Sequence, residues 1–185
     1  RGAMSDQEPA FIHAFELQRQ GRLQEAAAGY AAILKQNPGH FGALHYLGLI
    51  HHLTGHHERA ADYLGKALSQ RRDAEALNTF GLALDALDRA DEALAAFNEA
   101  IALDPAYAVA FYNRGNAYRD RGRDEAALAD FAAALARAPD LAEAHWNTGT
   151  LLLHRGEFAK GWAEFEWRFK TNAYRAHARD LPAPL

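Results

Sequence analysis

The chain has 185 residues, of which 49% are hydrophobic and none is cysteine, and its formal net charge is -4. This length suits one domain or one repeat array, and the lack of cysteine excludes disulfide bonds and thiol catalysis. The mild negative charge excludes a general attraction to nucleic acid or to an anionic membrane surface, and no apolar run approaches the ~20 residues of a membrane span.

The N-terminus carries features of processing. Arg1-Gly2-Ala3 is typical of a scar left by tag cleavage, which makes Met4 the expected native start. The residues that follow are polar and acidic, unlike a signal peptide. We therefore expect residues 1–6 to be a tag remnant with a disordered N-terminus, and the protein to be cytoplasmic.

From residue 7 the chain is expected to form pairs of short amphipathic helices. The first pair is predicted near residues 9–20 and 23–36. Successive pairs are expected to occupy residues 7–40, 41–73, 74–107, 108–141 and 142–175. Residues 176–185 contain two prolines, which cannot continue a helix, so this segment is predicted to be a linker.

The fourth pair shows the pattern most clearly. Its two helices are joined at Arg121-Gly122-Arg123 and closed by Pro139. Gly115 lies in the middle of the first helix, where glycine costs about 1 kcal/mol against alanine and so indicates a packing requirement. Ala127 and Phe131 on the second helix indicate a close approach of the two helices, with the aromatic ring filling the space beside it.

The same residues recur along the chain with a period of 33 or 34. Mid-helix glycines stand at Gly48, Gly81, Gly115 and Gly149. Small residues recur in the second helices, each followed four positions later by a large apolar residue: Ala26, Ala60, Ala93, Ala127 and Gly161 precede Tyr30, Leu64, Phe97, Phe131 and Phe165. The glycine-x2-tyrosine, alanine-x3-phenylalanine and closing proline of residues 115–139 resemble the tetratricopeptide repeat (TPR) family.

This resemblance covers residues 7–175. It implies an all-α, right-handed superhelical solenoid of about five helix-turn-helix hairpins. Four hairpins depart from the pattern. The first has Ala14 in place of the mid-helix glycine, and the second is one residue short and ends without proline. The third has Asp88 where glycine usually joins the helices, and the fifth has Gly161 in place of alanine.

In TPR arrays the first helix of each hairpin lines a concave groove, and the resemblance implies a protein or peptide ligand there. Some of the residues that it places in the groove are expected to pack only against a neighbouring hairpin. The groove residues expected in this chain are His45, Tyr46, Leu49, His52, Asn78, Thr79, Leu82, Asp85, Tyr112, Asn113, Asn116, Arg119, Trp146, Asn147 and Thr150.

An aromatic residue followed by asparagine occurs twice in these positions, at 112–113 and at 146–147. Asparagine offers donors and an acceptor to a peptide backbone, and an aromatic ring supplies contact area with little conformational entropy to lose. Arg119 is the only clear cation in the predicted groove. The lysine- and arginine-rich clamp of TPR modules that bind chaperone C-termini is therefore not expected.

The segment 156–168 and the final residues 179–185 resemble the last repeat and linker of bacterial proteins in which a TPR array precedes a glycosyltransferase domain, flagellin glycosyltransferases among them. This implies the N-terminal, substrate-recruiting part of a larger enzyme with a protein substrate such as flagellin. The alternative is a free-standing scaffold for complex assembly or self-association. In either case the aromatic residues at the end of the array can dock a partner surface or cap its last face: Phe158, Trp162, Phe165, Trp167 and Phe169.

The sequence offers few motifs for catalysis, nucleotide binding or metal binding. The sequence has no P-loop, GxGxxG, GxSxG, HExxH or cysteine-histidine zinc pattern. His52 and His56 are four residues apart and could share a metal, but Gly55 is expected to end the helix between them, and solvated turn histidines are the alternative. We expect no catalytic residue, no cofactor and no functional metal within the chain.

Overall fold

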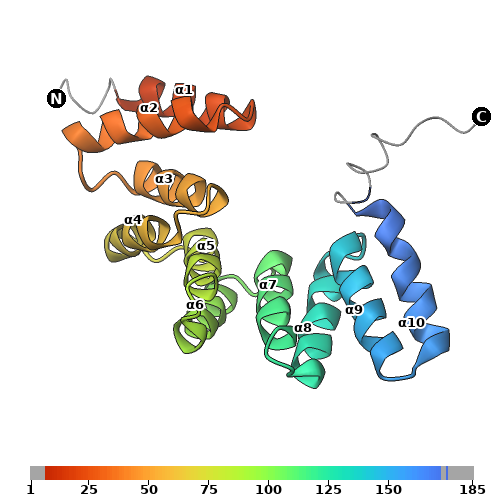
Figure 1. The fold of residues 1–185 in the computed structure, drawn as a ribbon. Coiled ribbons are helices and arrows are strands. Elements are labelled where there is room, and N and C mark those ends of the chain that lie inside the picture. The colour runs from red at the N-terminus through yellow and green to blue at the C-terminus, as the bar shows by residue number, and fades with distance from the viewer. Residues whose placement is uncertain (1–6, 172–173, 175–185) are drawn as a thin grey trace, which may run out of the picture. The chain divides into compact units, whose positions relative to one another are not determined.

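The computed structural model describes residues 7–171 and 174, and the tag remnant and linker expected at 1–6 and 176–185 lie outside these residues. Within the described part the chain is entirely helical, which confirms the predicted all-α fold (Figure 1). No helix among these residues is long and apolar enough to cross a membrane. The helices are α1 (Gln7–Arg19), α2 (Leu23–Gln36), α3 (Phe41–Leu53), α4 (His57–Gln70), α5 (Ala74–Asp85), α6 (Ala90–Leu103), α7 (Ala108–Arg119), α8 (Asp124–Arg137), α9 (Ala142–His154), α10 (Phe158–Phe165) and the 3-10 helix η1 (Glu166–Lys170).

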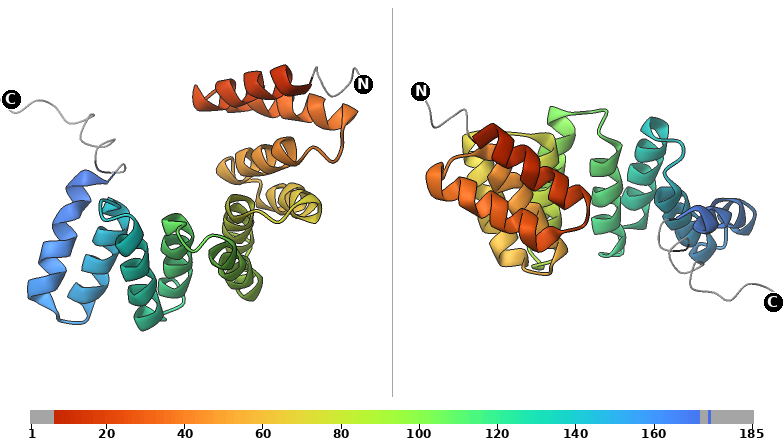
Figure 2. Two further views of the ribbon diagram at one scale, coloured as in Figure 1. Left: turned by 180° about the vertical axis from the view of Figure 1, so that it is seen from behind. Right: turned by 90° about the horizontal axis from the view of Figure 1, so that it is seen from above.

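Consecutive helices pair into five hairpins, and the two helices of each pair lie side by side in every view (Figures 1 and 2). The chain divides into two compact units, Arg1–Asp104 and Pro105–Leu185. We call them the N-terminal unit, which holds α1 to α6, and the C-terminal unit, which holds α7 to α10 and η1.

The turn inside each hairpin uses a residue with left-handed backbone. In four hairpins this residue is glycine, with φ of 77° at Gly21, 79° at Gly55, 68° at Gly122 and 79° at Gly156. The third hairpin places Asp88 in the same conformation with φ of 57°. Aspartate is one of the few residues with a side chain that visits this region routinely, which explains why the turn survives without glycine.

The mid-helix glycines of the second to fourth hairpins face a large side chain of the partner helix. A Cβ atom would lie 2.7 Å from Leu64 Cγ at Gly48, 2.6 Å from Phe97 Cε1 at Gly81 and 2.7 Å from Phe131 Cε1 at Gly115. Leu64, Phe97 and Phe131 are almost completely buried at these contacts. Glycine is therefore required at these positions because any side chain would overlap the large residue of the partner helix, as the glycine pattern predicted.

The fifth hairpin packs differently, because its two backbones approach each other directly. A Cβ atom on Gly149 would collide with the backbone nitrogen of Phe165 and lie 2.8 Å from its Cα atom. On the opposite helix, a Cβ atom on Gly161 would lie 2.9 Å from the backbone nitrogen of Leu153. This close approach accounts for glycine at position 161, where the other hairpins have alanine.

Candidate functional site

The first helices of the N-terminal unit carry eight of the predicted groove residues, and the structure divides them by burial. His45, Asn78 and Thr79 are buried, with exposed fractions of 5%, 4% and 6%. The other five are half-buried: Tyr46, Leu49, His52, Leu82 and Asp85. Most of these side chains therefore contribute to contacts between helices as well as to any open surface.

A cavity of about 550 Å³ lies in this unit where the N-terminal ends of α3 and α5 meet α1. His45 and Tyr46 line it, and their rings stack with centroids 4.9 Å apart and planes 21° apart. Arg71 also lines the cavity, with its Cζ atom 3.8 Å from the centroid of Phe41 and its Nη2 atom 3.3 Å from Asp73 Oδ2. Sequence reasoning found the histidine and the tyrosine but not the cavity, because its other walls come from loops and from α1.

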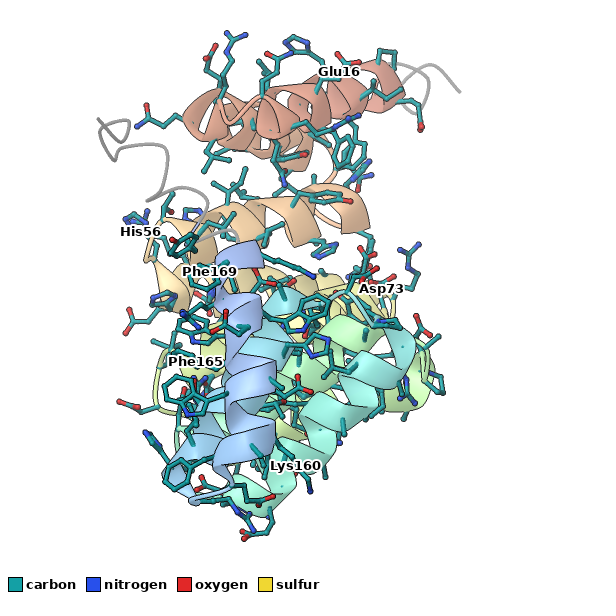
Figure 3. The ribbon with its side chains drawn as sticks, turned by 90° about the vertical axis from the view of Figure 1, so that its right-hand side faces the viewer. Glu16, His56, Asp73, Lys160, Phe165 and Phe169 are labelled. Atoms are coloured by element: carbon teal, nitrogen blue, oxygen red, sulfur yellow. The ribbon has the colours of Figure 1, made fainter. Side chains whose placement is uncertain are left out.

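Two side chains cap the helices that begin at this cavity. The backbone N–H of Ala43 donates to His40 Nδ1 over 3.1 Å at the start of α3. The backbone N–H of Ala76 donates to Asp73 Oδ1, also over 3.1 Å, at the start of α5 (Asp73 is labelled in Figure 3). Such caps satisfy N–H groups that a helix leaves unpaired at its first turn, and they hold the rim of the cavity in place.

Burial lowers the pKa of His45, so its imidazole is neutral at pH 7. A neutral imidazole has one N–H donor and one acceptor nitrogen. Within the described part of the chain no residue forms a hydrogen bond with this ring. His45 therefore presents unused hydrogen-bonding capacity to the cavity.

In the C-terminal unit the predicted groove residues form a polar network between α7 and α9. Asn147, which is 8% exposed, donates through Nδ2 to Asn116 Oδ1 over 2.8 Å and to the hydroxyl of Tyr112 over 3.4 Å. Trp146 precedes Asn147 on α9, and 36% of its surface is exposed. The structure thus joins three of the predicted groove residues, Tyr112 and Asn116 of α7 and Asn147 of α9.

Three further predicted groove residues of this unit, Arg119, Thr150 and Asn113, lie on α7 and α9. Arg119 Nε and Nη2 both donate to Asp120 Oδ1, over 2.9 and 2.8 Å. The hydroxyl of Thr150 donates to the backbone oxygen of Trp146 over 3.0 Å. Asn113 is half-buried.

Sequence reasoning missed an ion pair that positions α7. Arg114 donates through Nε and Nη2 to the two carboxylate oxygens of Asp130, each over 2.7 Å. The side chains are only 18% and 8% exposed, and the bonds to Asp130 raise the pKa of Arg114. The sequence feature that could have indicated this pair is Asp130, a charged residue next to the buried Phe131 on α8, since a buried charge needs a partner.

A second missed residue is His145 on α9. Its Nδ1 atom contacts Glu164 Oε2 and its Nε2 atom lies 2.8 Å from the backbone oxygen of Pro139. Its ring stacks on Trp167 with centroids 3.9 Å apart and planes 12° apart, and Lys170 Nζ lies 3.7 Å from the same indole. Trp167 is half-buried as a result.

The other aromatic residues at the end of the array differ in exposure. Phe158, Trp162 and Phe169 are 62%, 55% and 42% exposed, whereas Phe165 is half-buried. Phe165 and Phe169 follow one another toward the end of the last helical segment (Figure 3). Three of the five residues of the predicted docking end are thus exposed to solvent.

The histidines around the turn at Gly55 do not pair as His52 with His56, which the i,i+4 spacing suggested. The ring of His51 lies 5.8 Å from that of His56, and the ring of His52 lies 5.1 Å from that of His57. The Nδ1 atoms of His52 and His57 are buried without a hydrogen-bond partner in the described residues. Each pair offers two ligands, and residues 7–171 and 174 contain no group of three or more side chains that could hold a metal ion.

Comparison with known proteins places this geometry in a family. Residues 13–76 match a family model described as tetratricopeptide repeat, and residues 81–118 and 115–156 match one described as TPR repeat. Human tetratricopeptide repeat protein 6 is 30% identical over 115 residues, which are 60% of this chain and 22% of that protein. The chain therefore spans about a fifth of the length of this relative.

Solved structures show the same fold. PilF of Pseudomonas aeruginosa is 19% identical with a TM-score of 0.81, over 90% of this chain and 77% of that one. YrrB, described as a TPR protein with an unusual peptide-binding site, is 21% identical with a TM-score of 0.67, over 98% of this chain and 99% of that one. The family models and the solved structures thus agree on tetratricopeptide repeats along this chain.

Proposed function

The chain belongs to the tetratricopeptide repeat family, and on this premise we propose that it binds a protein or peptide partner along the first helices of its hairpins. The partner lies against the polar network on α7 and α9. The unusual peptide-binding site named for the similar protein YrrB supports a peptide ligand as the class to test first.

The observation that carries this proposal is that Asn116 and Asn147 each keep a side-chain hydrogen-bonding group that no other residue in the described part of the chain uses. Asn147 uses its Nδ2 group for Asn116 and Tyr112, and Asn116 uses its Oδ1 atom for Asn147. In the described residues no partner takes Asn147 Oδ1 or Asn116 Nδ2. An acceptor and a donor in neighbouring side chains match the N–H and C=O groups of an extended peptide backbone.

The exposed indole of Trp146 adds apolar contact next to this donor-acceptor pair. Aromatic residues of this kind dominate binding energy at protein interfaces, because they bury a large area at low entropic cost. A partner with backbone N–H and C=O groups to share therefore fits this surface best.

A pull-down from the source cell tests the proposal with a double variant, Asn116→Ala with Trp146→Ala. We expect capture of the partner to be lost, because truncating an aromatic hot spot costs about 2 kcal/mol or more, on the order of thirtyfold in affinity. Far-UV circular dichroism should show unchanged helical content. Trp162→Ala is the matched control, because this indole is also exposed but lies on α10. If the control loses the partner and the double variant keeps it, the groove is not the binding surface.

A second candidate function concerns the apolar face of α10. Trp162 is equivalent to Leu128 one repeat earlier, and Leu128 packs with Phe131 and with Leu151 of the following hairpin. The exposed Trp162 therefore occupies a position that is partly buried one repeat earlier, and Phe169 is exposed in the same terminal segment. We propose that a following domain covers them, in line with the resemblance of residues 156–168 to the last repeat before a bacterial glycosyltransferase domain.

On this second proposal the chain recruits a protein substrate, such as flagellin, for a glycosyltransferase in the cytoplasm. The alternative is a free-standing scaffold that self-associates through the same face. Reading the gene beyond the codon for Leu185 separates the two. A nucleotide-sugar-binding α/β domain supports the first, and a stop codon together with concentration-dependent dimers that Trp162→Ala abolishes supports the second.

A further inference from the structure

We propose that the cavity of the N-terminal unit binds a cationic side chain, arginine or lysine, of the partner. The proposal rests on the proposed function, because the cavity lies on the first helices α3 and α5. Its volume of about 550 Å³ falls in the range of about 300–1,000 Å³ that is usual for ligand pockets.

The charges around the cavity favour a cation. Three carboxylates line it, Glu8, Asp73 and Glu75, against the single guanidinium of Arg71. Asp73 already balances Arg71 at 3.3 Å. Neither Glu8 nor Glu75 forms an ion pair through its side chain in the part of the chain that the structure describes. Two uncompensated negative charges thus remain at the cavity.

The aromatic walls suit the same ligand. Phe11, Phe41 and Tyr46 line the cavity, and the rings of Phe11 and Tyr46 lie 5.9 Å apart. A cation over an aromatic face is attracted by the quadrupole of the ring. Arg71 over Phe41 shows that a guanidinium is accommodated between a ring and a carboxylate in this cavity.

His45 supplies the polar contact in the wall. It is 95% buried, lines the cavity, and has no hydrogen bond to its ring within residues 7–171 and 174. A neutral imidazole has an acceptor nitrogen that a guanidinium or ammonium N–H can reach. An imidazole without a protein hydrogen bond in the wall of a cavity can therefore accept a hydrogen bond from a cationic ligand.

An anionic ligand fits less well, although two helices begin at the cavity. Helix N-termini attract anions through their free N–H groups. Here His40 and Asp73 cap α3 and α5 and occupy one N–H group each. The positive charge of Arg71 is also balanced by Asp73, while the unpaired carboxylates of Glu8 and Glu75 repel an anion.

The test is an NMR titration of the ¹⁵N-labelled chain with three blocked tripeptides, acetyl-Ala-X-Ala-amide, in which X is arginine, its neutral isostere citrulline, or glutamate. We expect saturable shifts of the Gly39 and Gly42 amides, which line the cavity, with the arginine peptide. Citrulline should bind about tenfold more weakly, because it keeps the shape but loses the ion pair and the cation-π attraction. The glutamate peptide should not bind.

Two matched variants locate the effect. Glu75→Gln should weaken the arginine peptide about three- to fivefold, as expected for a partly exposed ion pair. Glu58→Gln makes the same change of charge at a residue of α4 outside this cavity, and should leave the affinity unchanged.

Equal affinity for arginine and citrulline, tighter binding of the glutamate peptide, or no saturable shift at millimolar peptide would each overturn the inference. The proposed function is judged separately by the pull-down. A partner that is captured through the network of the C-terminal unit while the arginine peptide fails contradicts only the cavity inference. An arginine peptide that binds while no partner is captured contradicts only the proposed function.

Discussion

The close approach of α9 and α10 makes Gly149 the most demanding glycine of the chain. In Gly149→Ala the new Cβ atom would lie 2.8 Å from Phe165 Cα and 2.9 Å from the carbonyl carbon of Glu164, and would collide with the backbone nitrogen of Phe165. These are backbone atoms, so no change of rotamer relieves the contact. The two helices of the fifth hairpin have to move apart.

The expected cost follows from two opposing contributions. Alanine is favoured over glycine inside a helix by about 1 kcal/mol. Overpacking a close contact costs about 1–3 kcal/mol, and the upper end applies here because the backbone itself has to shift. We therefore expect Gly149→Ala to lower the free energy of unfolding by about 2 kcal/mol, which is a decrease of about 4–8 °C in Tm for a chain of this size.

The three tryptophans allow the effect to be located. Trp146, Trp162 and Trp167 all lie in the fifth hairpin and in η1, so tryptophan fluorescence reports on this end of the chain, whereas far-UV circular dichroism reports on all helices. In a repeat array each hairpin is stabilised mainly by its neighbours. The Tm from fluorescence should therefore fall further than the Tm from circular dichroism.

Gly65→Ala is the matched control. Gly65 lies in the middle of α4, and no heavy atom outside its own helix turn comes within 4 Å of an added Cβ atom. This variant should be stabilised by about 0.5–1 kcal/mol, because only the helix preference changes. If Gly149→Ala is as stable as Gly65→Ala, the backbone contact between α9 and α10 is not as close as the structure shows.

Phe131→Ala should lower the free energy of unfolding in urea by about 3–5 kcal/mol, because it removes a completely buried ring. Leu53→Ala, at a residue that is 60% exposed, should change it by no more than about 0.5 kcal/mol, and similar losses at both sites would contradict the assigned core. Asp130→Asn should cost about 3 kcal/mol, since it leaves the guanidinium of Arg114 without its charged partner. The apolar double variant Arg114→Met with Asp130→Leu should lose less than this single change, and a larger loss would show that the charges themselves stabilise α7. Stability should also decrease as the pH falls below 6.5, because burial lowers the pKa of His45 in the folded chain and the unfolded chain then binds more protons. His45 contributes up to about 1.4 kcal/mol per pH unit to this slope, and burial also lowers the pKa of His51 and His52. The slope should therefore be smaller in His45→Leu, and an unchanged slope in denaturant titrations at pH 5 to 7.5 would exclude a contribution from His45.

The candidate site was only partly visible in the sequence. The aromatic-asparagine pairs indicated where α7 and α9 face each other, and the structure joins Asn116, Asn147 and Tyr112 there. The pattern did not reveal that Asn78 and Thr79 are buried, since equivalent positions on first helices can either pack or remain open. Nor did it reveal that the rings of His52 and His57 lie close together. The two residues are on different helices, and the turn at Gly55 sets the angle between α3 and α4, which residue spacing does not encode.

The sequence by itself determined the helical hairpins and their number. A hairpin depends on residues close together in the chain: a glycine between two helices, small residues where they cross, and a large apolar residue four positions on. These local requirements repeat with a period of 33 or 34 and can be read without any knowledge of distant contacts.

Only the tertiary structure decided which side chains face a cavity, pair or remain exposed. The cavity beside His45 is assembled from α1, two loops and the starts of α3 and α5, and the ion pair of Arg114 joins α7 to α8. Burial and charge pairing depend on neighbours that come from other helices and from the exact approach of their backbones. Gly149 shows this directly, because the same mid-helix glycine faces a side chain in three hairpins and a bare backbone in the fifth.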